Sequence, residues 1–515
     1  MKNFIKSSII FLALGAIIGI LAINVIYYSN MTHWEIPQIE YYGLKRNIMS
    51  ALIALVIIVS CHFISKIKIN KIAKRFLIVT ILILYGIVQL AWIINTPAKQ
   101  FADSLEVLRI SEKMTNNTPL SEYQKNYLQY YPQQLTMSVF FNNIFCLFRS
   151  NNYIILEIIN MISNVLMVIG LYLILVELEK KYKVNRVLFF VMTVLFVPII
   201  FLTSFIYGDF IGLACSVWSI LFYIKYIEKD KSRYIAYIGI LMSLACIVRM
   251  NYFIFVIAMV INLFIIRMDQ SSLGIRGVFK YFVVCFLIIV IVFLPSFILK
   301  KAYAKKYGLD MEKSFSTIPY LYMGMSEGER ANGWYNDEVG KIVFELMNSK
   351  DDIRPIMEDS KQKMKDRAGY MYRHPMYTYR FYRDKLITIW ADPTMEYKFY
   401  NTYDVESDDV NSHPIVKEIL FGKIYDYIVI YQKALITLIF IGALAAIIIK
   451  RKNMSNYMLL LYLSFLGGFI FHILWEAKSR YILPYIVVLI PNSCIGITAL
   501  IDKLKDKKSE NERQK

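Results

Sequence analysis

An acidic residue just beyond a long apolar run is the first candidate for chemistry in this sequence. Asp103 follows the apolar segment 76–95, which at about 20 residues can cross a bilayer core of roughly 30 Å. A carboxylate at such a helix end keeps its charge while it borders a dry interior, which suits a general base acting on a membrane-borne substrate. The competing interpretation is a solvated loop acid, or an N-cap for the segment 104–114.

Three cations fall at predicted helix ends on the same side of the membrane as Asp103. Arg249 stands isolated between two apolar runs, and Lys478 and Arg480 lie together in the segment 475–481. Arginine offers a bidentate fork and lysine a point charge, so the group could bind a lipid phosphate. The alternatives are snorkelling to the headgroups and binding of bulk anionic lipid.

A second acid and several tyrosines also fall on this face. Asp209 ends the sequence Tyr207-Gly-Asp between two apolar runs, where a simple Gly-Asp turn is the competing interpretation. Tyr131 precedes Pro132 at the predicted interface. Interfacial tyrosines are commonly belt residues, but here Tyr131 could also stack on a sugar or line a lipid groove.

The composition shows what must position these residues. The chain has 515 residues, 57% of them hydrophobic and 15% aromatic, with a mean hydropathy of +0.46. Such values indicate an all-α polytopic membrane protein. Runs of at least 18 apolar residues predict about twelve spanning helices. They lie near residues 8–28, 47–66, 76–95, 152–178, 187–207, 209–228, 234–250, 252–267, 277–299, 426–449, 455–474 and 481–501.

The net charge of +19 would commonly indicate nucleic-acid binding. Here the Lys and Arg residues fall in short loops between apolar runs, so the positive-inside rule explains them and no nucleic-acid partner is expected. The basic segments are 66–75, 179–186, 229–233, 267–276, 450–452 and the tail after 502. They predict a multi-pass cell-membrane protein with both termini cytoplasmic, provided that 131–148 forms a juxtamembrane or re-entrant helix outside. The first apolar run, to residue 28, is interpreted as a retained helix.

This topology divides the chain into four parts. Residues 1–299 form a transmembrane module whose outer loop, 96–151, carries Asp103. Residues 300–425 form a small mixed extracytoplasmic domain, with a helix over the charged stretch 361–373. Residues 426–501 hold the last membrane helices, and residues 502–515 form a basic cytoplasmic tail. The six cysteines show no paired spacing, and neither a disulfide framework nor a thiolate metal site is indicated.

The arrangement resembles the C-type membrane glycosyltransferases (the GT-C superfamily), and in layout glycosyltransferase family 39, which includes protein mannosyltransferases and aminoarabinose transferases. The resemblance covers most of the chain in architecture. The residues that carry it are Asp103, Tyr131-Pro-Gln-Gln134, Tyr207-Gly-Asp209, Arg249-Met-Asn251 and Glu476-Ala-Lys-Ser-Arg480-Tyr481. Two extra helices precede the one that leads into Asp103. The adjacent Asp-Glu pair of many members is absent, and Glu106 lies one helical turn away instead.

The resemblance implies transfer of a sugar from a polyprenyl-phosphate carrier to an acceptor on the extracytoplasmic face, with inversion. By this analogy Asp103 is the catalytic base and Asp209 a second acid that orients the acceptor or a metal. The donor phosphate would be held by Arg249, Lys478 and Arg480. Substrate contacts are expected from Glu106, Tyr131, Tyr207 and Tyr481. No cofactor is certain, and a divalent metal is left open.

Two other classes of protein would also fit a membrane chain with these residues. One is a transporter or flippase of lipid-linked sugars; transporters usually show repeats and ionisable groups near the midplane, whereas these polar residues gather at one face. The other is an envelope polysaccharide polymerase or ligase. The sequence leaves open the sugar, the carrier length, the oligomeric state and the acceptor, whether an envelope glycan, a lipid or a protein.

Overall fold

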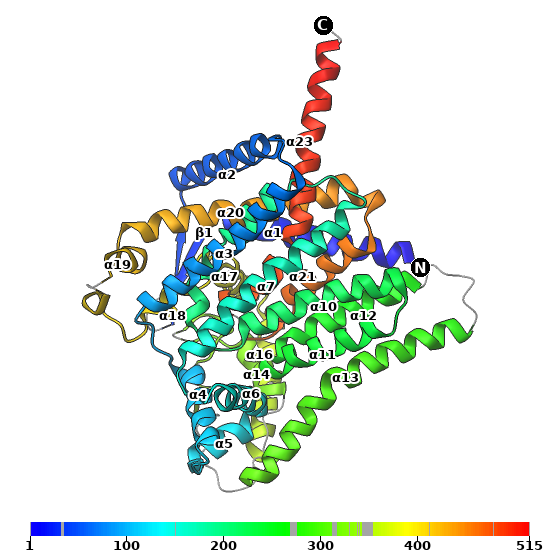
Figure 1. The fold of residues 1–515 in the computed structure, drawn as a ribbon. Coiled ribbons are helices and arrows are strands. Elements are labelled where there is room, and N and C mark those ends of the chain that lie inside the picture. The colour runs from blue at the N-terminus through cyan, green and yellow to red at the C-terminus, as the bar shows by residue number, and fades with distance from the viewer. Residues whose placement is uncertain are drawn as a thin grey trace.

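The computed structural model describes residues 2–31, 35–149, 151–267, 275–311, 317–328, 330–336, 338, 340–341, 354–410, 413–476 and 478–513. Almost all ordered elements in these ranges are helices, and most of the long ones run obliquely side by side (Figure 1). The strands of the described chain are β1 (Tyr27–Met31) and β2 (Pro37–Tyr41), which pair antiparallel with Tyr28 opposite Glu40. The sequence did not predict this hairpin.

Nine described helices are long and apolar enough to cross a membrane. They are α1 (Lys2–Ile26), α2 (Leu44–Ser65), α3 (Lys71–Asn95), α7 (Ile154–Glu179), α10 (Asp209–Lys229), α12 (Phe253–Arg267) together with the short η2 (Met250–Tyr252) that leads into it, α13 (Ile275–Tyr307), α20 (Lys423–Lys450) and α21 (Asn456–Leu474). This confirms the all-α, polytopic class.

Two bent helix pairs raise the number of candidate spans to eleven. The first pair joins α8 (Arg186–Val194) to α9 (Val197–Phe201) with η1 (Leu202–Ser204), and the second joins η6 (Ser479–Ile482) and α22 (Leu483–Val487) to α23 (Ile490–Arg513). The remaining predicted span corresponds to α11 (Arg233–Val248), which at 16 residues is shorter than a typical span. All twelve predicted segments therefore fall on helices, but the count of twelve spans stays a prediction.

Three shorter helices form a layer at one end of the bundle: α4 (Ala102–Thr115), α5 (Glu122–Tyr130) and α6 (Pro132–Phe148). A capping box between Ser121 and Gln124 begins α5, and Pro132 begins α6. Figure 1 shows α6 nearly end-on, whereas the long helices cross the view. Helix α6 is not among the candidate spans of the described chain, as the predicted topology requires.

Most described residues of 300–425 are in helices, beginning with the last turns of α13, and part of this region is embedded in the bundle. They form α14 (Thr317–Met325), α16 (Arg354–Arg373), α17 (Pro375–Trp390), α18 (Tyr397–Thr402), η4 (Ser407–Val410) and α19 (Pro414–Leu420). Helix α16 confirms the helix predicted over 361–373. Trp390, Tyr397 and Phe399 are buried in the main apolar core together with the long helices. Whether this region lies outside the membrane stays a prediction.

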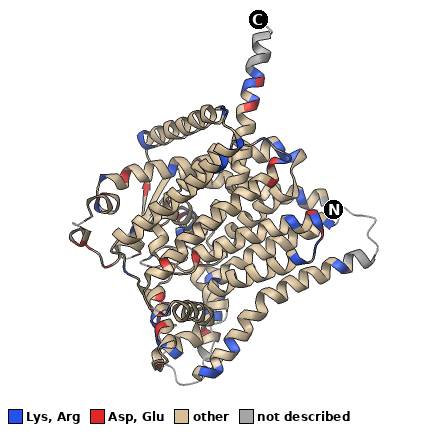
Figure 2. Ribbon diagram, viewed as in Figure 1, with Lys and Arg blue, Asp and Glu red and all other residues tan. Residues whose placement is uncertain are grey.

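Contacts between the basic loops gather them at the end of the bundle opposite to α4–α6. The Lys6 amine, near the N-terminus, donates to the Met454 carbonyl oxygen in the turn between α20 and α21 (2.7 Å). The Asn185 side chain, before α8, donates to the carbonyl oxygen of Cys61 near the end of α2 (3.0 Å). Figure 2 shows Lys and Arg at this end, where both chain termini also lie. The Tyr182 hydroxyl also donates to the Asn453 carbonyl oxygen (2.7 Å), so the N-terminal segment, the turn between α20 and α21, the loop before α8 and the end of α2 share one end of the molecule.

Candidate active site

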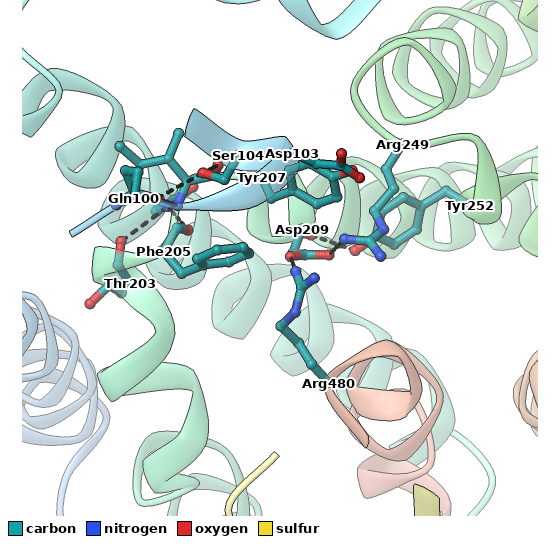
Figure 3. A network of polar contacts seen from close by, with 12 residues as sticks. Gln100, Asp103, Ser104, Thr203, Phe205, Tyr207, Asp209, Arg249, Tyr252 and Arg480 are labelled. Atoms are coloured by element: carbon teal, nitrogen blue, oxygen red, sulfur yellow. Dashed lines mark hydrogen bonds and ion pairs between the residues drawn. The ribbon is translucent and has the colours of Figure 1, made fainter. Parts of the chain in front are cut away.

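The first turn of α4 holds Asp103 in place through its neighbours Gln100 and Ser104. The Gln100 amide donates to the Ser204 carbonyl oxygen (2.6 Å), and the Ser104 hydroxyl lies 2.7 Å from the carbonyl oxygen of Ile206. Figure 3 shows this network joining the start of α4 to the segment before α10. The turn that carries Asp103 is thereby fixed against the residues that carry Tyr207 and Asp209.

Both carboxylate oxygens of Asp103 accept a hydrogen bond from a tyrosine. The Tyr127 hydroxyl donates to Oδ1 (3.0 Å) and the Tyr207 hydroxyl to Oδ2 (3.1 Å). The Gln134 amide donates in turn to the Tyr207 oxygen (2.6 Å). Residue Asp103 is exposed to water, although many protein atoms surround its carboxylate. A substrate can therefore reach the carboxylate, which is also partly shielded from solvent.

The surroundings of Asp103 shift its pKa upward. Burial among protein atoms raises the pKa of the carboxyl, and the hydroxyls of Tyr127 and Tyr207 only partly oppose that effect. Burial and the Asp103 charge raise the pKa of both tyrosines well above the ordinary value, so they remain hydrogen-bond donors at neutral pH. An ionised carboxylate with a raised pKa is a stronger base than a free one.

Asp209 is the first residue of α10 and forms ion pairs with both Arg249 and Arg480. Figure 3 shows its carboxylate between the two guanidinium groups. Gly208 makes this arrangement possible, because its φ is +75° and a Cβ there would lie 3.0 Å from the Val248 carbonyl oxygen. The segments around Gly208 and Val248 therefore approach each other closely. This allows Arg249, which follows Val248, to reach Asp209.

Aromatic rings enclose the two arginines. The guanidinium carbon of Arg249 lies 4.5 Å from the ring centre of Tyr481 and 5.2 Å from that of Tyr207. Arg480 lies 4.6 Å from the ring centre of Tyr400 and 5.5 Å from that of Tyr207. Tyr207 thus contacts both cations and also donates to Asp103, which links the base to the cationic cluster. These cation–π contacts stabilise charge where little water is present.

Arg480 has an unused hydrogen-bond donor. Its side chain is 5% exposed, and its Nε makes no hydrogen bond among the residues that the structure describes. A buried donor without a partner is costly, so this N–H is suited to an incoming acceptor such as a phosphate oxygen. The space beside Asp209 and Arg480 is only about 10 Å³, which means that a larger ligand has to displace side chains there.

Lys478 lies in a second cluster of charge. Its ammonium pairs with the Glu35 carboxylate and lies 4.1 Å from the ring centre of Trp334. Glu35 also accepts from the Arg330 guanidinium (2.7 Å) and from the Trp334 indole N–H (3.2 Å). Burial alone would raise the pKa of Glu35, but Lys478, Trp334 and Arg330 together hold it below the usual range. Glu35 is therefore an ionised counter-charge.

Buried polar groups fix the segment that carries Lys478 and Arg480. The backbone N–H of Ser479, between these two cations, donates to Glu396 Oε1 (2.9 Å), and the Ser479 hydroxyl lies 2.7 Å from Asp392 Oδ2. The Lys385 amine donates to the carbonyl oxygens of Ile473 and Trp475 (2.9 and 2.7 Å), near the C-terminal end of α21. These bonds fix the backbone at Ser479 and at the preceding end of α21, and thereby the directions in which Lys478 and Arg480 point.

The structure brings together most of the residues that the sequence singled out. Asp103, Tyr207, Asp209, Arg249, Arg480 and Tyr481 form one connected network, and Lys478 is joined to it through contacts with the Tyr400 ring (5.7 Å). The Tyr131 ring lies 5.4 Å from that of Tyr127, at the edge of the network. Glu106 instead lines a separate open hollow of about 420 Å³ with Arg109 and Tyr123. Their catalytic and binding roles remain predictions.

Sequence reasoning missed several members of the network. The role of Tyr127 could not be predicted, because nothing in the neighbouring sequence distinguishes it from the many other tyrosines. Glu35, Asp392, Glu396 and Tyr400 lie far from their partners in the sequence, so nothing in the spacing could join them. Glu476 was visible in the 475–481 cluster without a role; burial and then the nearby charge of Asp103 raise its pKa to about 7. Among the described residues, no group of three or more His, Cys, Asp or Glu could hold a metal ion.

Comparison with protein families gives one match. The model of the dolichyl-phosphate-mannose-protein mannosyltransferase family matches residues 135–298. Comparisons with curated proteins and with solved structures give no match. The matched region contains Tyr207, Asp209 and Arg249, whereas Asp103 and Arg480 lie outside it. The chain resembles a GT-C glycosyltransferase, and this supports the resemblance drawn from the sequence.

Proposed function

We propose that this protein is an integral-membrane glycosyltransferase that moves a sugar from a polyprenyl-phosphate carrier to an acceptor on the extracytoplasmic face. The observation that carries the proposal is the position of Tyr207. This residue donates to Asp103 and contacts both arginines of the Asp209 cluster, so the proposed base and the proposed phosphate-binding group both contact one side chain. A sugar phosphate bound there would have its anomeric carbon between them.

The reaction that fits this geometry is a single displacement. Asp103 accepts the proton of the acceptor hydroxyl, and the hydroxyl oxygen attacks the anomeric carbon. The bond between that carbon and the phosphate oxygen breaks, and polyprenyl phosphate leaves with the bonding electrons. One displacement inverts the configuration at the anomeric carbon. Tyr127 and Tyr207 keep the carboxylate directed at the acceptor, which lowers the entropic cost of reaching the transition state.

The cations stabilise the leaving group as its charge develops. Arg249 and Arg480 provide fixed N–H groups, and Lys478 provides a third positive charge from the adjoining cluster. Preorganised cations in a site with little water supply a large part of such catalysis. Asp209 holds the two guanidinium groups in place before the donor binds and shares them with the phosphate afterwards. In this role Asp209 positions the phosphate-binding groups.

The acceptor approaches from the side of α4. Tyr131 and Tyr481 flank the network, and the hollow at Glu106 begins one helical turn from Asp103. An envelope glycan, a lipid or a protein would each present a hydroxyl group to Asp103. We place Glu106 on this acceptor side, away from the phosphate.

The proposal requires the α4–α6 layer to face outward and the basic loops to face the cytoplasm. We therefore expect a single cysteine at position 68, in a variant without the native cysteines, to resist a membrane-impermeant maleimide in intact cells. A cysteine at position 372 should react, because Tyr372 is 89% exposed and lies in α16 on the opposite side of the proposed membrane. Labelling of position 68 and protection of position 372 would contradict the proposed orientation.

Binding of the lipid product tests the donor class without knowledge of the sugar. Purified protein in nanodiscs should bind polyprenyl phosphate and discriminate against the polyprenol of equal length, because the arginine cluster recognises the phosphate. Native mass spectrometry measures both ligands in one sample. An equal occupancy of the two lipids would exclude the arginine cluster as a phosphate site and remove the basis of the proposal.

A further inference from the structure

A carboxylate from the N-terminal hairpin enters the proposed active site. Glu35 lies between the strands β1 and β2, some 440 residues before its partner Lys478 in the sequence. Lys478 is 2% exposed and faces the rings of Trp334 and Phe399, at 4.1 and 5.1 Å from its amine. A buried ammonium is stable only with a counter-charge or hydrogen-bond acceptors, and Glu35 is its ion-pair partner.

The backbone at Glu35 is held in an uncommon conformation. Its φ is +60°, in the left-handed region that residues other than glycine seldom adopt. Such a conformation costs of order 1–3 kcal/mol and persists where surrounding contacts enforce it. The contacts of the side chain include Arg330 and Trp334, which both donate to Glu35 Oε2. The carboxylate is thus held through Oε2 while Oε1 pairs with Lys478.

The hairpin itself is fixed to the elements that line the site. The Ser29 backbone N–H in β1 donates to the Ala391 carbonyl oxygen (3.2 Å), and Lys433 in α20 bonds the carbonyl oxygens of both Tyr27 and Ala391 (2.7 and 3.1 Å). Ala391 directly precedes Asp392, which holds Ser479 beside Lys478. The hairpin and the 478–480 segment are thus bound to the adjacent residues Ala391 and Asp392. These bonds fix the position of the hairpin that carries Glu35 relative to Lys478.

We infer that Glu35 is a positioning residue for transfer: it holds the Lys478 ammonium in the direction from which that group stabilises the departing phosphate. This inference rests on the proposed function, because it gives Lys478 the role of a phosphate-binding cation. The segment that supplies Glu35 belongs to the N-terminal part of the chain, before the helix that leads into Asp103. This part would then complete the site in addition to anchoring the protein in the membrane.

A double-mutant cycle tests the inference. Glu35→Gln keeps the size of the side chain and removes its charge, and we expect transfer to fall roughly 10-fold or more, in the range found for groups that orient a site residue. Lys478→Met should also impair transfer. The double variant should be no slower than Lys478→Met alone, because Glu35 acts through Lys478 and coupled residues are not additive. Glu40→Gln, on the exposed strand β2, is the control and should retain full transfer.

The wild type, the two single variants and the double variant distinguish failure of the proposed function from failure of the inference about Glu35. If Lys478→Met transfers at the wild-type rate, the proposed phosphate role of Lys478 fails, whatever Glu35 does. If Lys478→Met is impaired and Glu35→Gln is not, the proposed function stands and the inference is wrong. If the effects of the two substitutions multiply, Glu35 acts independently of Lys478, which also overturns the inference. A purely structural role would lower the thermal unfolding midpoint of Glu35→Gln while the folded fraction of that variant transfers at the wild-type rate, which also overturns the inference.

Discussion

Replacement of Asp103 by asparagine should reduce sugar transfer by roughly 10²–10⁴-fold, the usual contribution of a positioned general base. Asparagine has nearly the same size and its carbonyl oxygen can still accept from Tyr127 or Tyr207, but it cannot take up the proton of the acceptor hydroxyl. We therefore expect folded, membrane-inserted protein that still binds polyprenyl phosphate. Transfer is measured with reconstituted protein under single-turnover conditions.

The matched control for this substitution is Glu106→Gln on the same helix. Glu106 lies one turn further along α4 and lines the open hollow, so its loss should cost much less than the loss of Asp103. Near wild-type transfer by Asp103→Asn would reject the base assignment. The N-cap of α4 is Phe101, so Asp103 is not the cap that the sequence allowed. Failure of that variant to fold or insert would show instead that the Asp103 carboxylate serves to hold Tyr127 and Tyr207 in place.

The raised pKa of Asp103 gives the pH profile a defined direction. The base must be ionised, so the rate should rise with pH through the Asp103 pKa and level off above it. Because burial raises this pKa, the acid limb should lie above the ordinary aspartate range near pH 4. Loss of this acid limb in Asp103→Asn would accompany the fall in rate.

Replacement of Arg480 by lysine should produce the second large effect. Loss of one preorganised donor to a developing oxyanion typically costs about 10²–10³-fold, and lysine keeps only the point charge, so turnover should fall at least about 10-fold. The flat guanidinium also fits against Tyr400 and Phe205, at 4.6 and 4.5 Å from their ring centres. A lysine ammonium cannot reproduce both contacts together with the pair to Asp209.

Arg186→Lys supplies the control for this second substitution. Arg186 binds Glu179 through two nitrogen atoms at the opposite end of the bundle, so the same chemical change there tests the general cost of losing a bidentate arginine. We expect Arg186→Lys to retain transfer and Arg480→Lys to lose it at comparable expression. Wild-type turnover by Arg480→Lys would remove this residue from the phosphate site.

The helical framework could be predicted from the sequence because apolar length is a local property. The segment 76–95 lies within α3 and the segment 361–373 lies within α16, each defined by its own residues. The hairpin β1–β2 was missed because two strands of five residues between long apolar helices give only a weak pattern. The sharp bends in the α8–α9 and α22–α23 pairs were not predicted either, since an apolar run does not show where it bends.

The sequence also allowed the charged residues of the site to be recognised individually. Lone charges at the ends of apolar runs are costly, so Asp209, Arg249 and Arg480 could be recognised one at a time. Their pairing could not, because it depends on how α10, η2 (Met250–Tyr252) and η6 meet in space. The sequence therefore predicted a phosphate-binding role for the cations without showing which carboxylates pair with them: Asp209 with the two arginines and Glu35 with Lys478.

The most direct test of the central claim is a mass-spectrometric comparison of the lipid-linked sugars and envelope components of cells that contain the wild-type protein, no protein, or Asp103→Asn. Transfer from a lipid carrier predicts the same result in the last two: a sugar-loaded polyprenyl phosphate accumulates, and one envelope component loses the mass of that sugar. A flippase would be expected to need no such base. Cells with Asp103→Asn that match the wild type, while cells without the protein show the defect, would contradict the claim that this chain is a glycosyltransferase with Asp103 as its base.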